Sequence, residues 1–367
     1  MRIPAIIATL AIVAGCCCIP SKPLPRAKAD PLMAETLEQY LKAVADSAED
    51  LHSVMVLQHG KVIMEKQIAP DTAHVMHSVS KTFTSTAVGF AISEGLLSLE
   101  DKIVDLFPEC VPEEPQERLS EITIRHLLTM NCGHGKDPTG AVRYTDGDWI
   151  KCFMEWPIAY EPGKCYCYNS LGTYLLSAAV QKVTGEKVVD YLDSRLWQPL
   201  GIEKPHWDES PAGINTGGWG LYIHTEDMAR MGLCILNGGK FCGKQVIPAE
   251  WVREMSANQV PSVGAGLNEE QMKEILAAHP DLPYFLPENS DWVQGYGYQM
   301  WRCRHNAFRA CQRGARSGET ENATWRDTSL RNGRSIDSWE VPSSASSAAA
   351  AASMVERQCA AGSARMR

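Results

Sequence analysis

The sequence contains no excess of positive charge, since 35 Lys and Arg residues stand against 44 Asp and Glu residues and the formal net charge is −9. A protein that neutralises nucleic-acid phosphates needs a cationic surface, so nucleic acid is not an expected partner. The apolar run at residues 6–14 is well short of the roughly 20 residues that cross a bilayer as a helix. With 367 residues, 44% hydrophobic and 22% charged, the chain has the composition of a globular protein with one large or two smaller domains.

Patterns typical of metal sites are missing as well. The chain has no Cys-x-x-Cys pair, no His-Glu-x-x-His segment and no His-x-His cluster. Cys165 and Cys167 would supply at most half of such a site, so we expect no structural metal. The 13 cysteines are an odd number without a repeating framework, and their disulfide pairing cannot be deduced from the sequence.

The N-terminus has the pattern of an export signal. Arg2 precedes the short apolar run, and Val13-Ala14-Gly15-Cys16 is similar to the lipobox of bacterial lipoproteins. We predict an exported protein, either periplasmic or anchored to the membrane by a lipid on Cys16. Ordinary cleavage at Ala27-Lys28-Ala29 and a buried N-terminal helix are the alternatives. In each case residues 1–30 are expected to be signal and spacer, with the folded domain after them.

The composition changes abruptly after Ala310. Residues 311–367 contain 11 Ala, 10 Ser and 8 Arg but no Lys, and Ser343–Ser353 is a low-complexity Ser/Ala segment. Such a segment has too little apolar surface to offset the entropy of ordering. We therefore expect the folded domain over residues 31–310, followed by a disordered tail. Our hypothesis for the tail is a reading-frame shift near Ala310.

The central part of the chain predicts both helices and strands. Leu37 and Leu41 belong to a helical apolar pattern that starts near residue 31 and predicts an amphipathic helix packed on the body. Two apolar runs, Leu51–Gln58 and Lys61–Glu65, are joined by His59-Gly60 and predict a β-hairpin. A buried helix is expected from Ser78 to Gly95. Further helices are expected at residues 123–130, 171–184, 188–196, 225–237 and 248–255.

Ser78-Val79-Ser80-Lys81 places a hydroxyl and an amine three residues apart at the start of that buried helix. Residues with this spacing lie on one helix face, so the two groups can meet. A lysine whose pKa is lowered by burial can take the proton of a serine hydroxyl, and a helix N-terminus favours an oxyanion beside it. The pattern predicts a nucleophilic Ser78, although Ser-x-x-Lys alone is a weak signal that also fits a polar helix start with a solvated lysine.

The sequence around this pair resembles the serine β-lactamase-related hydrolases, which include class C β-lactamases, D-alanyl-D-alanine carboxypeptidases and family VIII esterases. The resemblance extends roughly from Leu51 to Ala310. It rests on ten blocks in a fixed order: His77–Ser85, Gly95–Lys102, Ile122–Met130, Glu161–Gly163, Tyr168–Ser170, Leu175–Leu176, Val183–Gly185, Pro199–Gly201, Gly217–Leu221 and Thr225–Ala229.

This resemblance implies an α+β fold of the β-lactamase and penicillin-binding-protein type. In that α/β sandwich an antiparallel sheet is flanked by helices and joined to an all-helical region. It also implies a small-molecule or peptide substrate, no cofactor, and an acyl-enzyme on Ser78. The family's Tyr-x-Asn element corresponds to Tyr168-Asn169-Ser170, with Ser170 where Asn is commoner. Tyr168 would then relay protons with Lys81, while Asn169 and Ser170 would bind substrate, Ser170 with a shorter reach.

Other conspicuous residues have more ordinary interpretations. We expect His126 and His134 to be packed or surface imidazoles rather than catalytic bases. Trp219, Trp292 and Trp301 are expected to be core or site-wall aromatics rather than a ligand cage. No Gly-x-Ser-x-Gly segment offers a competing nucleophile.

The family's third element, a Lys-Thr-Gly or His-x-Gly segment, should follow Gly295–Trp301 within a few residues and is absent. The resemblance then implies that the C-terminal strands are missing, including one that donates an oxyanion N–H. Loss of one such donor typically costs about 100- to 1000-fold in kcat. We predict an exported serine hydrolase that acts on β-lactams, D-Ala peptides or esters, with activity reduced by the altered C-terminus. A catalytically silent envelope binding protein and a nonfunctional truncated product are the alternatives.

Overall fold

A computed structural model describes residues 22–46, 51–262, 294–304 and 307–310 of the chain. The predicted signal segment with Cys16, Trp292 and the tail after Ala310 lie outside these described residues. Within the described residues, no helix is both long and apolar enough to cross a membrane.

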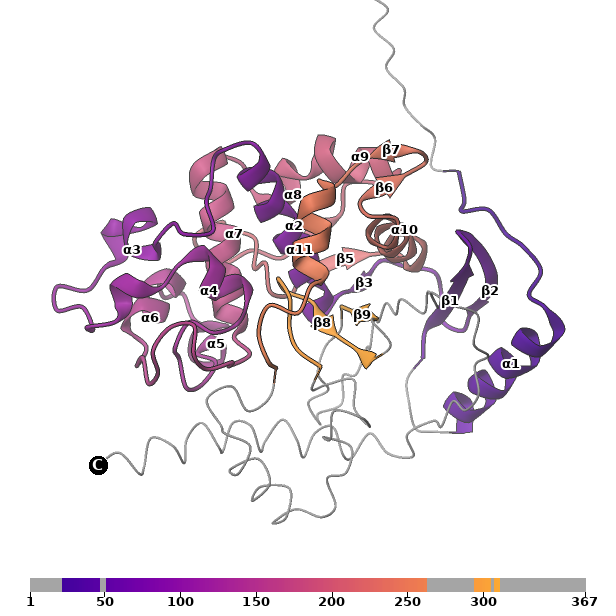
Figure 1. Ribbon diagram of the computed structural model, residues 1–367, viewed down its shortest axis with the longest axis horizontal. Helices are drawn as coiled ribbons and strands as arrows, with labels where there is room; N and C mark the ends of the chain where they lie inside the picture. Colours follow the sequence, from indigo (N-terminus) through magenta and orange to yellow (C-terminus); the bar gives the residue numbers. More distant parts are fainter. Residues whose placement is uncertain (1–21, 47–50, 263–293, 305–306, 311–367) are drawn as a thin grey trace, which may run out of the picture.

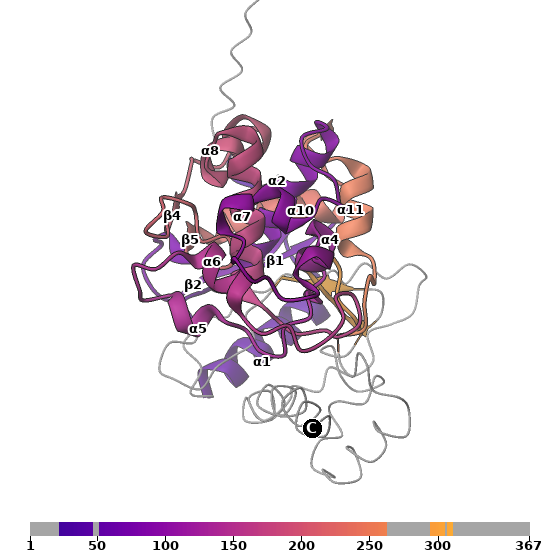
Figure 2. The same ribbon diagram turned by 90° about the vertical axis from the view of Figure 1, so that its left-hand side faces the viewer.

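The described residues form a helical body around one buried helix. Helix α2 (Ser80–Ser93) packs against α7 (Ser170–Thr184), and the two lie side by side in both ribbon views (Figures 1 and 2). Apolar residues such as Phe83 and Ala87 are fully buried, which explains why α2 lies at the centre. The remaining helices are α3 (Ile103–Leu106), α4 (Ile124–Leu128), α5 (Thr139–Val142), α6 (Trp149–Glu155), α8 (Val188–Tyr191), α9 (Gln198–Leu200), α10 (Thr225–Leu236) and α11 (Ala249–Ser256).

The strands of the described residues are short and antiparallel. β1 (Ser53–Gln58) pairs with β2 (Lys61–Gln67). A second sheet has the order β3-β5-β4, built from β3 (His74–Val75), β5 (Leu221–Ile223) and β4 (His206–Trp207). Two further pairs join β6 (Lys240–Phe241) to β7 (Lys244–Gln245) and β8 (Trp301–Arg302) to β9 (Phe308–Arg309). The mixture of helices and antiparallel strands confirms the predicted α+β class.

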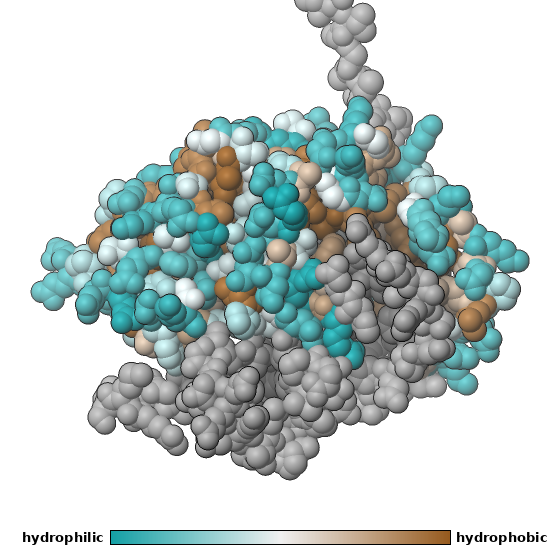
Figure 3. Space-filling view, in the orientation of Figure 1, coloured by the Kyte–Doolittle hydropathy of each residue, from teal (hydrophilic) through white to brown (hydrophobic). Residues whose placement is uncertain are grey.

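The predicted hairpin and most predicted helices are present. His59 and Gly60 both have positive φ, 50° and 74°, as a two-residue type I′ turn requires. The predicted buried helix begins as a 3₁₀ turn at His77–Val79 and continues as α2, which ends at Ser93 with Glu94 as its C-cap, just before Gly95, whose φ is 74°. In the orientation of Figure 1, hydrophilic residues cover most of the coloured surface, with smaller hydrophobic areas between them (Figure 3).

The N-terminal helix differs from its prediction in one respect. Helix α1 (Pro31–Asp46) forms where it was expected, but Leu37 and Leu41 are only half-buried and Leu32 and Tyr40 are exposed. Figure 1 shows α1 near the β1–β2 hairpin, away from the helical body. Within the described residues, this sheet has only two strands, too small a surface to bury the apolar face of a 16-residue helix.

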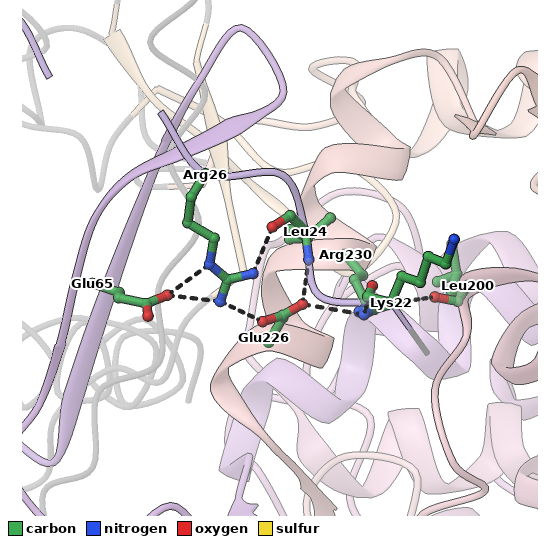
Figure 4. A network of polar contacts seen from close by, with 7 residues as sticks. All are labelled: Lys22, Leu24, Arg26, Glu65, Leu200, Glu226 and Arg230. Atoms are coloured by element: carbon green, nitrogen blue, oxygen red, sulfur yellow. Dashed lines mark hydrogen bonds and ion pairs between the residues drawn. The ribbon is translucent and has the colours of Figure 1, made fainter. Parts of the chain in front are cut away.

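The segment just before α1 ties the hairpin to α10. Arg26 donates to Glu65 of β2 at 2.7 Å and to Glu226 of α10 at 2.8 Å, and the Leu24 N–H donates to Glu226 at 2.6 Å (Figure 4). Arg230 adds a hydrogen bond to the carbonyl of Lys22 at 2.7 Å. We call residues 22–27 the strap, because they connect two elements that are distant in sequence.

Glu226 is expected to be the main anchor of the strap. Burial alone would raise the pKa of Glu226, but hydrogen bonds from Arg26 and the Leu24 N–H hold that pKa below its ordinary 4.5. A carboxyl with a depressed folded pKa stabilises the protein above about pH 4.5, and this stabilisation fades as the pH falls through the folded pKa. Glu226→Gln should therefore lower the free energy of unfolding by about 1–2 kcal/mol at pH 7.

Denaturant titrations at pH 7 and pH 3.5 test this expectation. The difference between wild type and Glu226→Gln should shrink at the lower pH. The matched control is Glu250→Gln, which removes an exposed partner of Arg253 and should change stability by less than about 0.5 kcal/mol. Equal effects of the two substitutions would show that the strap does not hold the hairpin.

Candidate active site

Ser78 lies where the small sheet meets the central helix. Strand β3 leads into the 3₁₀ turn at His77–Val79, and Ser78 is half-buried within that turn. His77 has a φ of 37°, a left-handed conformation that costs a residue other than glycine about 1–3 kcal/mol. The Met76 N–H donates to the carbonyl of Leu221 at 2.7 Å, which fixes the turn to β5. The backbone that leads into Ser78 is therefore tied to strand β5.

Lys81 is buried one turn further along, and its ammonium group reaches three oxygens. Nζ lies 3.1 Å from Ser78 Oγ, 3.1 Å from Ser170 Oγ and 2.8 Å from the carbonyl oxygen of Gly218. The structure thus brings together Ser78, Lys81 and Ser170, three of the residues that the sequence predicted for the site. The i, i+3 spacing was sufficient to predict the first contact.

The environment of Lys81 favours the neutral amine. Burial lowers the pKa of Lys81 to about 7 from an ordinary 10.5, with a smaller lowering by the positive charge of Arg143. The negative charge of Asp137 acts in the opposite direction and raises the pKa. A lysine with a pKa near 7 is neutral in a large fraction of molecules at physiological pH, so it can accept the proton of Ser78.

The segment Gly217–Leu221 forms the second side of the site and is held by α2. The Thr84 hydroxyl donates to the Gly217 carbonyl at 2.8 Å, and the Leu221 N–H donates to Ser80 Oγ at 3.3 Å. Gly217 has a φ of 66°, and a Cβ there would lie 2.9 Å from Ser177 Cβ. Only glycine fits this position without displacing its neighbours. The close packing at Gly217 therefore helps to keep the adjacent Gly218 carbonyl within hydrogen-bond distance of Lys81.

Tyr168 lies over the amine of Lys81. Lys81 Nζ is 4.9 Å from the centroid of the Tyr168 ring, within the range of a cation–π contact. The same ring stacks on Trp301 at 5.8 Å with an interplanar angle of 13°, and it meets Tyr296 edge-on at 6.3 Å. Trp301 therefore forms part of the wall of the site, as the sequence predicted.

A buried glutamine fixes the segment that carries Trp301. Gln299 has a φ of 64°, and its side-chain amide donates to the carbonyls of Leu127 and Leu128 at 3.0 and 3.1 Å. Thr173 of α7 donates to the side-chain oxygen of Gln299 at 2.8 Å. Gln299, two residues before Trp301, thereby joins this segment to α4 and α7.

Asn169 and Ser170 begin helix α7. The Asn169 side-chain oxygen accepts the Gly172 N–H at 2.9 Å as an N-cap, and its Nδ2 lies 3.0 Å from His134 Nδ1. Asn169 is buried, so its side chain has a clear part in forming the helix start, and its substrate-binding role stays a prediction. The Ser170 N–H donates to Asp137 at 3.0 Å, while the Ser170 hydroxyl faces Lys81.

The two histidines of this region are packed within the body. His126 closes a capping box with Thr123 at the start of α4, and burial lowers its pKa. His134 is fully buried beside Phe153, and burial lowers its pKa to about 4. These contacts agree with the packed roles predicted for both residues. Among the described residues, no group of three or more His, Cys, Asp and Glu side chains could hold a metal ion.

Sequence reasoning did not identify three groups that act on Lys81. They are the Gly218 carbonyl, Asp137 and Arg143. The Gly217-Gly218-Trp219-Gly220 block was a signal for the first, because closely spaced glycines often mark a close approach of the backbone. Asp137 and Arg143 lie on a loop and on the end of α5, and no periodic pattern marks them.

The fold and the contacts of Ser78, Lys81 and Ser170 are those expected of a serine hydrolase of the Ser-x-x-Lys type. Residues 36–307 match the family model described as Beta-lactamase, well over half of the chain. The chain therefore belongs to the Beta-lactamase family of serine hydrolases. It is 26% identical over 287 residues to the 6-aminohexanoate-dimer hydrolase of Paenarthrobacter ureafaciens, covering 72% of this chain and 69% of that protein.

Solved structures share the fold at low sequence identity. The octameric penicillin-binding protein homologue from Pyrococcus abyssi is similar with a TM-score of 0.54 and 16% identity, over 76% of this chain and 67% of that one. EstCE1, described as a hydrolase with promiscuous acyltransferase activity, gives a TM-score of 0.54 and 17% identity over 74% and 83%. These likenesses support the predicted β-lactamase and penicillin-binding-protein fold.

Proposed function

We propose that the protein hydrolyses ester or amide bonds through an acyl-enzyme on Ser78. Ser78 Oγ forms a bond to the substrate carbonyl carbon while its proton passes to the neutral Lys81 amine. The bond to the leaving group then breaks, and the leaving group departs with that proton; we assign the relay of this proton to Tyr168, whose ring centroid lies 4.9 Å from Lys81 Nζ. Water attacks the ester on Ser78 in the same manner, releasing the acid and restoring the serine.

One observation carries this proposal: the buried Lys81 amine lies 3.1 Å from Ser78 Oγ with its pKa lowered to about 7. A solvated lysine at a polar helix start would be exposed and fully charged. The name of the Paenarthrobacter relative refers to an amide substrate and the description of EstCE1 to acyl transfer. These names support an acyl donor as substrate, with β-lactams, D-Ala peptides and simple esters as the compounds to compare.

Turnover of a chromogenic β-lactam, a D-Ala-D-Ala peptide and a nitrophenyl ester tests the proposal. Ser78→Ala should abolish turnover of whichever compounds are cleaved. Ser93→Ala, which removes an exposed hydroxyl at the far end of the same helix, should leave it unchanged. Turnover that survives in Ser78→Ala would contradict the proposal. A folded protein that cleaves none of the compounds would instead favour the silent binding protein.

The acylation rate should depend on pH with the profile of a base. Because the neutral amine of Lys81 is the reactive form, the rate should rise about tenfold per pH unit below pH 7 and level off above it. Single-turnover kinetics with a nitrophenyl ester between pH 5 and 9 measure this profile. A rate that is flat across pH 7 would mean that Lys81 is not the base.

We propose further that the chain is exported and processed at Cys16. The contacts of the strap with Glu65 and Glu226 support this site over a cut at Ala27-Lys28-Ala29, which would separate the strap from the body. Mass spectrometry of the mature protein from bacterial membranes should find a lipid-modified N-terminal cysteine. A mature N-terminus at Asp30 would contradict the proposal.

A further inference from the structure

An unpaired cation lies beside the candidate active site. Arg143 is exposed, and among the described residues its guanidinium has no hydrogen bond and no carboxylate partner. In contrast, Arg125, Arg195 and Arg253 each face a glutamate. The Cζ atom of Arg143 lies instead 5.4 Å from the ring centroid of Trp219 and 5.4 Å from that of Tyr144. Its hydrogen-bond donors are therefore available to a ligand.

Trp219 connects this arginine to the site and holds it in place. It directly follows Gly218, whose carbonyl accepts the hydrogen bond from Lys81. Its ring stacks on Trp149 at 5.7 Å, and its own carbonyl accepts from Trp207 Nε1 at 2.8 Å. The Trp219 ring is thus a fixed platform, and an arginine over such a ring is oriented without losing its charge.

The positive charge of Arg143 acts on Lys81, the proposed base. It lowers the pKa of Lys81, second to burial among the lowering effects, whereas Asp137 raises that pKa. Asp137 and Arg143 differ in their contacts with the rest of the protein. Asp137 accepts from the Ser170 N–H and from Thr139, so it is already engaged within the protein. Arg143 is the charge of this pair that remains open to a substrate.

We propose that Arg143 recognises a carboxylate on the acyl donor, so that the site prefers anionic substrates over neutral ones of the same shape. This proposal rests on the acyl-enzyme function proposed above. The planar guanidinium can donate two parallel hydrogen bonds to a carboxylate, a geometry that a lysine cannot reproduce. The carboxylate could be carried by the acyl part or by the leaving group, and the experiment separates these two cases.

Two matched ester pairs test the proposal. The first pair is the nitrophenyl monoester of adipic acid and its methyl-capped diester, which differ in charge on the acyl part. The second pair is the butanoate ester of 4-hydroxybenzoate and that of its methyl ester, which differ in charge on the leaving group. The ratio of kcat/KM within each pair is measured in wild type, Arg143→Gln, Arg143→Lys and Lys136→Gln at pH 8.5, where the protonation of Lys81 has little influence.

In at least one pair, wild type should prefer the anionic ester, and Arg143→Gln should reduce that preference by about 10- to 100-fold. Arg143→Lys should retain part of it. Lys136→Gln removes an exposed positive charge from the loop that precedes α5 and should retain all of it. Neutral esters that are cleaved normally, with a preference unchanged in Arg143→Gln, would overturn this proposal alone. Failure to cleave even the neutral esters, with Ser78 unlabelled, would instead overturn the proposed function.

Discussion

Lys81→Met should reduce the acylation rate of Ser78 by about 10²- to 10⁴-fold, the usual contribution of a positioned general base. The buried amine of Lys81 contacts Ser78 Oγ, Ser170 Oγ and the Gly218 carbonyl at once. Methionine has a similar length and is apolar, so it can occupy the same volume. It cannot accept a proton from the serine, and the nucleophile is left without activation.

The same substitution should not destabilise the protein. Burial lowers the pKa of Lys81, so folding disfavours the charged form, and this cost is complete below about pH 7 and lost as the pH rises toward 10.5. Replacing a buried charge by an apolar residue is often neutral or stabilising by about 1–4 kcal/mol. Thermal melts at pH 6 and burst kinetics measure the two effects separately, with the exposed Lys102→Met as control.

If Lys81→Met is inactive but melts at or above the wild-type temperature, then Lys81 serves catalysis and not the stability of the fold. A variant that keeps its acylation rate, or that loses activity only because it unfolds, would contradict the assigned role.

Gly217→Ala should impair both stability and acylation. A side chain at a φ of 66° is strained, and its Cβ would lie 2.9 Å from Ser177 Cβ and 3.0 Å from the Thr173 carbonyl oxygen. Backbone strain and overpacking together should cost about 2–5 kcal/mol in the free energy of unfolding. The segment must also shift, which moves the Gly218 carbonyl away from Lys81, and acylation should fall by about tenfold or more even where the protein is folded.

Gly213→Ala is the matched control for this prediction. Gly213 has a similar φ of 71°, but no atom lies within 4 Å of the position its Cβ would take. Gly213→Ala should lower the free energy of unfolding only by the cost of the left-handed backbone, about 1–2 kcal/mol, and should leave the acylation rate unchanged. Denaturant titration and burst kinetics on both variants make the comparison. Equal losses in the two would mean that close packing around Gly217 has no part in the site.

The elements that the sequence predicted well are those with strong local signals. The hairpin follows from two apolar runs and the His59-Gly60 turn, and the contact between Ser78 and Lys81 follows from helical spacing. The start of α7 was also expected within one residue, and the structure shows Asn169 as the N-cap of this helix. In each case the residues that decide the structure are neighbours in the sequence.

Features that depend on distant segments could not be predicted in this way. The Gly218 carbonyl reaches Lys81 from 137 residues along the chain, and Gln299 joins α4 and α7 across more than 120 residues. The packing of α1 was overestimated, because its apolar spacing is the same whether or not a large sheet lies beside it. Long-range placement of single polar groups leaves no periodic trace in a sequence.

Mass spectrometry of the intact protein after treatment with a fluorophosphonate or a fluorescent penicillin tests the central role of Ser78 most directly. We predict a single covalent adduct, located on the peptide that contains Ser78 and missing from Ser78→Ala. A cooperatively folded protein that acquires no adduct with either reagent, or an adduct on another residue, would contradict it.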